Sequence, residues 1–373
     1  MNRKRQNCGI RLARMFVVLI SVCCLISLNG TVAAEWYQFT ADDVPEEAGY
    51  LVSDFTGSIR ITFLGDCTLG GEEAYRNSPQ GFVKTIEREG YSYPFENLTF
   101  LTANDDLTVA NLEGVLSDKR LGKAEKTFNF SGLTEYTEIL RRGGIECVSL
   151  ANNHTYDYGA AGYEDTQAAL ADAGIAFFGT DQVAACEIHG VMIGFAGISI
   201  TLNGAAGPRF QKQIAALKNM GCSVIITVMH AGREYRHTPN VYQRRMAGKA
   251  VSYGTDLVIG HHPHVVQGYE TIEGIPVVYS LGNCVFGGNQ KPDEYEAVAV
   301  QAELIFEDGQ AEKIRLHFYP ILTSGTDGLN DFRPVIPDRE ISEHILNVMK
   351  DSTGVGFTEL TDADGAIAEF DIQ

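Results

Sequence analysis

Side chains that can bind a divalent metal ion recur directly after short apolar runs of this sequence. Five such groups contain Asp66, Glu113, Asn152-Asn153-His154, His230 and His261-His262-Pro263-His264. Carboxylate, amide and imidazole groups together suit manganese, iron or zinc better than calcium, although ligand type does not choose among the three. His262 and His264 form the most specific pair, because alternate residues of an extended segment share one side and two such imidazoles can bind one ion or two neighbouring ones. The sequence thus predicts a divalent-metal site.

Each group also has a structural explanation when it is considered alone. Asp66 after Gly65 is typical of a turn, as is Asn152-Asn153, and His230 at the end of an apolar run is compatible with a core histidine. Independent turn residues need not recur as metal-ligand types at nearly every run end, so their recurrence favours the metal site. A network of buried polar side chains stays open as the alternative.

Two carboxylates are candidates for orienting the imidazoles. Asp157 follows His154 closely in the sequence, and Glu234 follows His230. Imidazoles that bind a metal usually donate their other N–H to a carboxylate or a carbonyl, which favours this role. Exposed carboxylates at a turn or at a helix start are the equally open alternative.

A basic loop follows Glu113. Its cations and the aromatic residues beyond them are Lys119, Arg120, Lys123, Lys126, Phe128 and Phe130. On a chain with a net charge of -19, local cations beside a proposed metal ligand are candidates for holding a substrate carboxylate or phosphate. A solvated loop is the alternative.

The apolar runs before these polar groups predict the strands of a layered α/β domain. Several runs are β-branched and nearly continuous, as in strands buried on both faces. They cover residues 59–64, 107–110, 145–150, 175–178, 191–196, 224–229, 257–259 and 277–280. Helix-like segments alternate with them, for example 163–173, 208–220 and 242–253. Because the carboxyl ends of strands in open α/β sheets form the ligand crevice, the polar groups are expected at one edge.

The N-terminal residues 1–34 have the pattern of a secretory signal. Basic residues precede an apolar run at 15–28, and small residues follow at 32–34. The run is short for a membrane span, so we expect cleavage, with retention of 15–28 as an N-terminal anchor as the alternative. In either case we expect the rest of the chain in the cell envelope or outside the cell.

The remaining chain divides into three segments. Residues 35–57 are acidic and aperiodic and are predicted to be a linker. Residues 58–320 form the α/β domain and end in a hairpin of two strands at 297–306 and 313–319. Residues 321–373 form a C-terminal extension that we expect to pack on the domain and to contain a helix near 341–349.

Composition excludes several classes of protein. A hydrophobic content of 45% with 21% charged residues is globular. The charge of -19 repels nucleic acid and other polyanions at long range, so an anionic substrate would have to be held by local cations or by metal. Of eight cysteines, five lie after the signal, none in C-x-x-C spacing. These five therefore indicate neither a disulfide framework nor a zinc-thiolate site, and most of them are expected to be small apolar core residues in strands.

Several motifs, in this order, resemble the CapA family of poly-γ-glutamate capsule synthesis proteins, whose domain belongs to the calcineurin-like metallophosphatase superfamily. The matching segments are Gly65-Asp66, Asn111-Leu112-Glu113, Asn152-Asn153-His154 with Asp157 and Gly159, His230-Ala231-Gly232-Arg233-Glu234, Gly260-His261-His262-Pro263-His264 with Gln267-Gly268, and Tyr279-Ser280-Leu281-Gly282-Asn283 with Phe286. The resemblance runs from about residue 59 to 320. It implies a metallophosphoesterase-like sandwich, in which two mixed β-sheets pack face to face and helices flank them.

The resemblance also implies roles for individual residues. The metal ligands carried over by position are Asp66, Glu113, Asn153, His230, His262 and His264. His154 would be the catalytic acid or anion-stabilising imidazole, with Asp157 as its partner. Asn152 and Glu234 would support the ligands, and the residues assigned to substrate binding are Lys126, Arg233 and Asn283.

This sequence departs from the wider phosphatase pattern at two positions. The first motif there is Asp-x-His, whereas Asp66-Cys67-Thr68 has no histidine, and Glu113 replaces the bridging aspartate. One position of a two-metal site therefore lacks a ligand, and the site is expected to hold one or two ions of manganese, iron or zinc.

Two functions follow from the resemblance. The first is a metal-dependent hydrolase that acts on an anionic envelope polymer such as poly-γ-glutamate. The second is a non-catalytic assembly or export factor that binds the polymer in the same crevice, in either case with a membrane-bound synthesis complex as a candidate partner. A nucleophilic enzyme based on Ser280 or Cys284 is disfavoured, because the sequence has no Gly-x-Ser-x-Gly turn.

Overall fold

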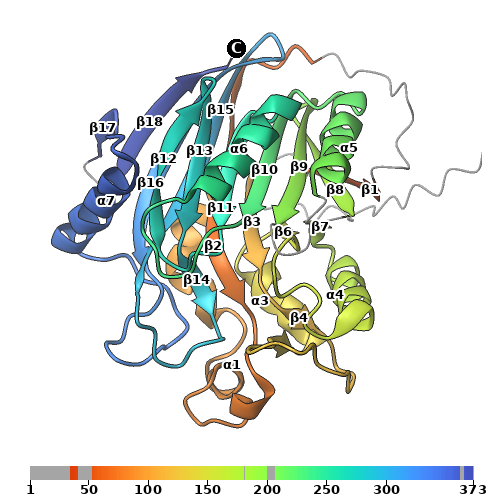
Figure 1. Ribbon diagram of the computed structural model, residues 1–373, viewed down its shortest axis with the longest axis vertical. Helices are drawn as coiled ribbons and strands as arrows, with labels where there is room; N and C mark the ends of the chain where they lie inside the picture. The colour runs from red at the N-terminus through yellow and green to blue at the C-terminus, as the bar shows by residue number, and fades with distance from the viewer. Residues whose placement is uncertain (1–33, 41–52, 180, 200–205, 362–364, 373) are drawn as a thin grey trace, which may run out of the picture.

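The computed structural model describes residues 34–40, 53–179, 181–199, 206–361 and 365–372. Within these ranges two large mixed β-sheets form the centre of the molecule, with helices outside them (Figure 1). The two packed sheets and flanking helices confirm the predicted fold class.

The first sheet has seven strands within the described ranges. In spatial order they are β1 (Glu35–Thr40), β8 (Gln182–Ile188), β9 (Val191–Ser199), β10 (Val224–His230), β11 (Leu257–His261), β13 (Ile275–Leu281) and β12 (Val266–Ile272). The central strands β9, β10, β11 and β13 run parallel to one another, whereas β8 and β12 pair antiparallel with β9 and β13. The carboxyl ends of the four central strands therefore lie at one edge of the sheet.

The second sheet has nine strands within the described ranges. They are β17 (Glu359–Leu360), β18 (Ala366–Asp371), β16 (Gln310–Leu322), β15 (Glu296–Glu307), β2 (Gly57–Thr68), β3 (Leu107–Leu112), β6 (Cys147–Ser149) and β7 (Ala176–Phe178), with β14 (Asn283–Phe286) beside β2. Strands β2, β3, β6 and β7 run parallel. β15 and β16 form the predicted hairpin. A separate pair, β4 (Val115–Leu116) and β5 (Ser131–Gly132), lies outside both sheets.

The main core lies between the two sheets. It contains Phe63 and Val109 from the nine-stranded sheet and Phe195, Val228 and Ile259 from the seven-stranded sheet, all buried. β9 and β10 are buried along their whole length because helices cover their other face. Burial on both faces explains why these strands are continuous apolar runs in the sequence.

Helices cover the outer faces of both sheets (Figure 1). The helices are α1 (Phe82–Glu89), α2 (Thr99–Thr102), α3 (Thr137–Arg142), α4 (Gly159–Asp172), α5 (Ala206–Asn219), α6 (Val241–Tyr253) and α7 (Arg339–Thr353). α5 and α6 pack on the seven-stranded sheet, and α1 to α4 pack on the nine-stranded sheet. Asn240 begins α6 with a capping box to Gln243, and Asp338 caps α7, so both helices have defined starts.

The first part of the predicted linker is a strand. Residues Glu35–Thr40 form β1, which pairs antiparallel with β8. Trp36 is only 6% exposed and its ring lies 6.0 Å from that of Phe195 in the core. The linker prediction is therefore wrong for 35–40, because a partner strand distant in sequence gives this short segment a surface to bury. Residues 41–52 lie outside the described ranges.

The C-terminal segment is built into the nine-stranded sheet and its core. β18 pairs with β16, and Ile345 and Met349 of α7 are fully buried in the core between the sheets. The predicted boundary at 320 falls inside β16, which runs to Leu322. The proposed signal or anchor at 1–34 lies almost wholly outside the described ranges. Among the described residues, no helix has the length and apolar character needed to cross a membrane.

Candidate metal centre

The carboxyl ends of strands from both sheets meet at one place. Asp66 pairs with Asn111 near the carboxyl ends of β2 and β3, His230 pairs in register with His261 across β10 and β11, and Asn283 of β14 pairs with Asp66. The close approach of β14 requires glycine at 65, because a Cβ there would lie 2.3 Å from the carbonyl oxygen of Gly282. Six predicted ligands, Asp66, Glu113, Asn153, His230, His262 and His264, come together at this junction.

Asp66 is a buried carboxylate with many partners. It accepts hydrogen bonds from the Asn111 side-chain amide at 2.8 Å and from the backbone N–H of His262 at 3.2 Å. Its oxygens also lie 3.1 Å from His261 Nδ1 and 3.3 Å from His264 Nδ1. Burial alone would raise the pKa of this carboxyl, but the contacts to the two imidazoles outweigh burial and hold it well below its ordinary value.

Glu113 is a buried carboxylate without such partners. Its side chain is 0% exposed, and neither carboxylate oxygen accepts a hydrogen bond from a described residue. Oε1 lies 3.6 Å from His230 Nε2, 3.8 Å from His154 Nε2 and 3.9 Å from His264 Nε2. Burial first, and then the charge of Asp66, raises the pKa of Glu113 well above its usual range. A buried carboxylate without donors is costly, and a cation in this position would remove that cost.

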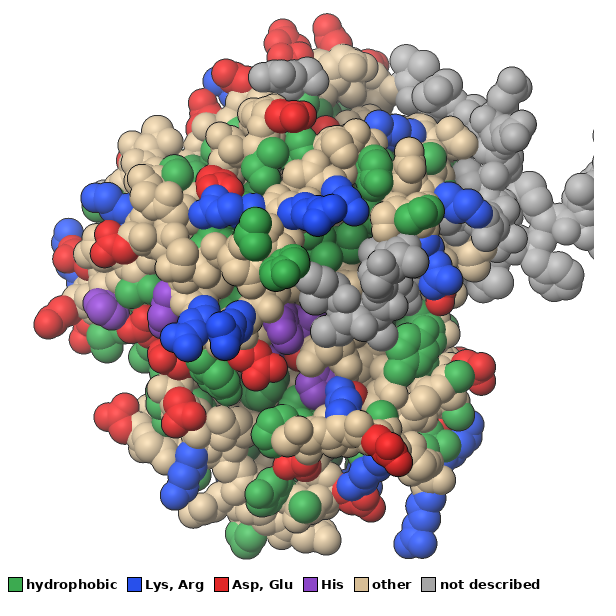
Figure 2. Space-filling model, in the orientation of Figure 1, with side chains coloured by type: hydrophobic (Ala, Val, Ile, Leu, Met, Phe, Trp, Pro, Cys, Tyr) green, Lys and Arg blue, Asp and Glu red, His purple; other side chains and the backbone are tan. Residues whose placement is uncertain are grey.

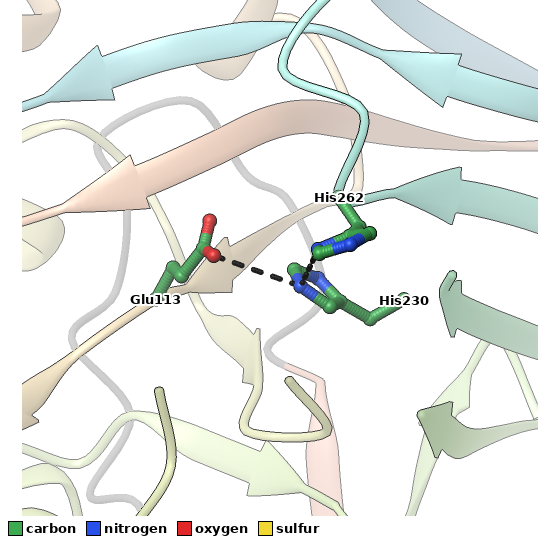
Figure 3. Close-up of side chains that lie close together, drawn as sticks. All are labelled: Glu113, His230 and His262. Atoms are coloured by element: carbon green, nitrogen blue, oxygen red, sulfur yellow. Dashed lines mark hydrogen bonds and ion pairs between the residues drawn. The ribbon is translucent and has the colours of Figure 1, made fainter. Parts of the chain in front are cut away.

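His230 and His262 face the same point as Glu113 (Figure 3). His262 Nδ1 lies 3.1 Å from His230 Nε2, and the latter lies 2.6 Å from Asn153 Oδ1. Burial and the neighbouring imidazoles lower the pKa of both rings, that of His262 to about 4. Both are therefore neutral at pH 7, which is the form that binds metal.

Among the described residues, three sets of side chains have ligand atoms close enough to hold an ion. They are Glu113 with His230 and His262, Asp66 with Glu113 and His264, and Glu234 with His262 and His264, and the ligand atoms within each set lie within 4.8 Å of one another. The first two sets share Glu113. The donor chemistry and the unpartnered Glu113 oxygens thus fit a divalent ion, and the shared carboxylate fits two neighbouring ions.

The backbone that carries His262 and His264 is not extended. Both residues have positive φ, 98° and 58°, which is uncommon for non-glycine residues and indicates local strain. Their ring centroids are 6.1 Å apart. The prediction that the two imidazoles converge holds, but the reason given for it is wrong, since a tight turn rather than strand alternation aims them at the site.

His154 is held at the rim of the centre. Its Nδ1 lies 2.7 Å from Asp157 Oδ2, and its ring stacks on Phe130 at a centroid distance of 4.3 Å. Lys126 forms an ion pair with Asp157 and donates to the backbone oxygen of Asn153 at 2.9 Å. Burial lowers the pKa of His154, and the hydrogen bond to Asp157 opposes this shift. Asp157 therefore lies where an orienting carboxylate is expected, and Lys126 is engaged with it.

Of the other predicted site residues, Asn152 and Asn283 contact the residues of the centre, and Glu234 lies beside other imidazoles than the predicted one. The Asn152 amide donates to Asn111 Oδ1 at 3.1 Å and its carbonyl accepts from the backbone of His154 at 3.0 Å, so it fixes this loop. Asn283 Oδ1 lies 2.8 Å from His264 Nδ1 and positions that ring. Glu234 lies beside His262 and His264 rather than orienting His230 as predicted.

The structure gives Arg233 and Lys126 other surroundings than their predicted role in substrate binding requires. Arg233 is exposed and is not among the residues that line the pocket beside the centre. The Nζ of Lys126 forms an ion pair with Asp157 and a hydrogen bond to the backbone oxygen of Asn153. The five cysteines after the signal are free, as predicted.

Two partners of Asp66 were missed in the sequence. Asn111 and His261 both contact its Oδ1; Asn111 lies two residues before Glu113, and His261 directly precedes His262. His261 is the last residue of β11. The pair of adjacent histidines is the sequence signal that could have indicated a second imidazole at the centre.

A pocket of about 460 Å³ adjoins the centre, and His154 and His264 form part of its wall. Histidine side chains reach the surface in the middle of the face drawn in Figure 2, with charged side chains of both signs near them. The centre is therefore accessible from solvent through this pocket.

Comparisons with known proteins agree with this arrangement. The chain is 27% identical over 281 residues to the "Capsule biosynthesis protein CapA" of Bacillus anthracis, which covers 68% of this chain and 65% of that protein. It is 26% identical over 250 residues to the "PGA biosynthesis protein CapA" of Bacillus subtilis (strain 168), covering 61% of this chain and 63% of that one. A "probable polyglutamine synthesis accessory protein" of Mycobacterium tuberculosis is 28% identical over 267 residues, covering 61% and 68%.

The match thus spans slightly less than two thirds of the length of the two Bacillus proteins. The sequence model described as "Bacterial capsule synthesis protein PGA_cap" matches residues 60–288, which is more than half of the chain and contains every predicted metal ligand. The chain belongs to the bacterial capsule synthesis protein family PGA_cap.

Proposed function

We propose that this chain is an extracytoplasmic protein of capsule or poly-γ-glutamate synthesis and that its metal centre is a hydrolase site. The printed names of the relatives support the pathway. The observation that carries the hydrolase proposal is Glu113, a fully buried carboxylate that faces three imidazoles and accepts no hydrogen bond from any residue that the structure describes. Export rests on the basic and apolar pattern of residues 1–34.

The residues that would hold a divalent ion are those of the two sets that share Glu113. When bound there, such an ion would activate a water molecule at neutral pH and polarise the bond to be cleaved. Asp157 accepts from Nδ1 of His154 when that nitrogen carries the proton, which leaves Nε2 as the atom that faces the centre. When the ring is doubly protonated, Nε2 also carries a proton, and it is positioned to give that proton to a leaving group or to stabilise developing negative charge.

A non-catalytic binding role in polymer assembly or export is the second candidate. It is favoured by Thr68, which stands where the wider phosphatases have a histidine and donates to the backbone oxygen of Glu113 at 2.8 Å instead of pointing a ligand into the centre. In that case the same crevice would bind the polymer without cleaving it.

Metal analysis of the purified protein, paired with a hydrolysis screen on phosphodiesters and on poly-γ-glutamate, separates the two candidates. We expect bound manganese, iron or zinc and turnover that chelation abolishes, with Glu113→Gln lacking both. Bound metal without turnover on any substrate would favour the assembly role. Activity that survives both chelation and replacement of His230 would refute the hydrolase mechanism.

A further inference from the structure

The pocket beside the metal centre, here called the side pocket, has an aromatic wall. Phe128 stacks with Phe130 at 6.4 Å, Phe130 meets Phe286 edge-on at 5.7 Å, and Phe286 lies 5.0 Å from the ring of His264. The rings of Tyr75, Phe128 and Tyr235, which all line this pocket, are 55%, 53% and 48% exposed. Several aromatic faces at one concave site are more typical of a binding surface than of an ordinary loop.

The charge of the side pocket is negative. Three carboxylates line it, Glu72, Glu234 and Asp293, together with Lys291 and the imidazoles of His154 and His264. None of the three carboxylates forms an ion pair with another residue in the part of the chain that the structure describes.

The basic loop does not compensate for these acids. Lys123 pairs with Glu73 at 2.9 Å, Lys126 pairs with Asp157, and Lys119 pairs with Asp165. Three of the four cations that we considered for holding an anionic substrate are therefore neutralised by carboxylates of the protein itself. A polycarboxylate chain that entered the side pocket would meet three carboxylates against Lys291, so the net charge of the pocket would repel it and the metal centre would have to attract it.

We propose that the side pocket binds an ammonium-bearing group of the substrate, next to the polar or anionic group that the metal centre takes. A cation is attracted by the negative faces of aromatic rings and by the carboxylates, and the two contributions act at the same place. The position of this subsite relative to the bond cleaved rests on the proposed function, whereas binding of the ammonium group does not.

Choline and 3,3-dimethylbutan-1-ol test this proposal, because they have the same shape and differ in having nitrogen or carbon at the quaternary centre. Both are titrated into the metal-free, isotope-labelled full chain and followed by NMR. We expect choline to bind about tenfold more tightly, since cation–π attraction of 1–2 kcal/mol corresponds to that ratio. Equal affinity for the two compounds would overturn the proposal.

Three variants locate the binding. Asp293→Asn and Phe128→Ala, which alter the side pocket only, are expected to reduce the preference for choline to below about threefold. Asp351→Asn on the exposed face of α7 is the matched control and should leave it unchanged. A preference that survives both pocket variants would place the choline elsewhere and refute the assignment.

Two further measurements separate this proposal from that of the metal centre. Glu113→Gln should lose metal binding but keep the preference for choline, because Glu113 does not line the side pocket. N-Acetyl-γ-glutamylglutamate, a dipeptide with carboxylates but no ammonium group, should bind the metal-free protein more weakly than choline does. Tighter binding of the dipeptide would overturn the ammonium subsite, whether or not the protein proves to be a hydrolase.

Discussion

Replacing each of the two buried carboxylates by its amide should have opposite effects on the metal-free protein. Asp66→Asn removes an acceptor for Asn111, for the backbone of His262 and for two imidazoles. Breaking a buried, paired carboxylate costs about 3–5 kcal/mol. Glu113→Gln removes a charge that has no donor, so we expect the free energy of unfolding to stay constant or to rise by up to about 2 kcal/mol.

The assay is thermal unfolding of each variant with chelator and with added metal. For a chain of this size 1 kcal/mol corresponds to about 2 °C, so metal-free Asp66→Asn should unfold about 6–10 °C below the wild type. Metal at a hundred times its dissociation constant should stabilise the wild type by about 2.7 kcal/mol, or about 5 °C. Both variants should lose most of this shift.

The contrast between the two variants tests whether Glu113 lacks a structural partner and lies at the metal site. If metal-free Glu113→Gln were destabilised as much as Asp66→Asn, Glu113 would have a structural partner and its isolation would no longer indicate a cation. A full metal-induced shift in Glu113→Gln would place the ion elsewhere in the protein.

Three further predictions concern the fold. Burial raises the pKa of Glu146 from 4.5 to about 8, so its contribution to stability is full below about pH 4.5 and declines as pH rises to about 8. The free energy of unfolding, measured by denaturant titration from pH 5 to 8, should therefore change less with pH in Glu146→Gln than in the wild type. The same pH dependence in both proteins would contradict this pKa. Gly260→Ala should lower the melting temperature and weaken metal binding in a direct titration, because its Cβ would lie 2.1 Å from the carbonyl oxygen of Tyr279. An unchanged melting temperature would exclude this close approach. Trp36→Ala should lower the free energy of unfolding, measured by urea titration, by about 3–5 kcal/mol, because Trp36 is buried in the core. A loss below about 1 kcal/mol would indicate that residues 35–40 are a linker after all.

The positions of the strands and the convergence of their ends could be predicted from the sequence. Parallel strands buried on both faces appear as apolar runs, and the direction of the chain then places whatever follows each run at the same edge. This argument needs no knowledge of loop conformation. It is why Asp66, Glu113 and His230, which lie directly at or after strand ends, were identified together.

Features that depend on distant partners or on loop conformation could not be predicted. The positive φ angles of His262 and His264 follow from packing around the turn, and an alternating pattern gives no sign of them. β1 forms only because β8 offers it an edge and Phe195 a surface for Trp36. The partners of Lys126 and Glu234 were likewise set by loops that bring residues together across long sequence separations.

The polar residues at the strand ends have two explanations, a metal site and a network of buried polar side chains, and the two predict different hydrogen bonding. A structural network of buried polar groups requires each member to have hydrogen-bond partners. Asp66, Asn111 and Asn152 meet this requirement through contacts with one another and with the backbone. Glu113 does not, although it is as deeply buried as they are. The network therefore explains the scaffold of the site, and Glu113 is the member of it whose buried carboxylate a bound cation would satisfy.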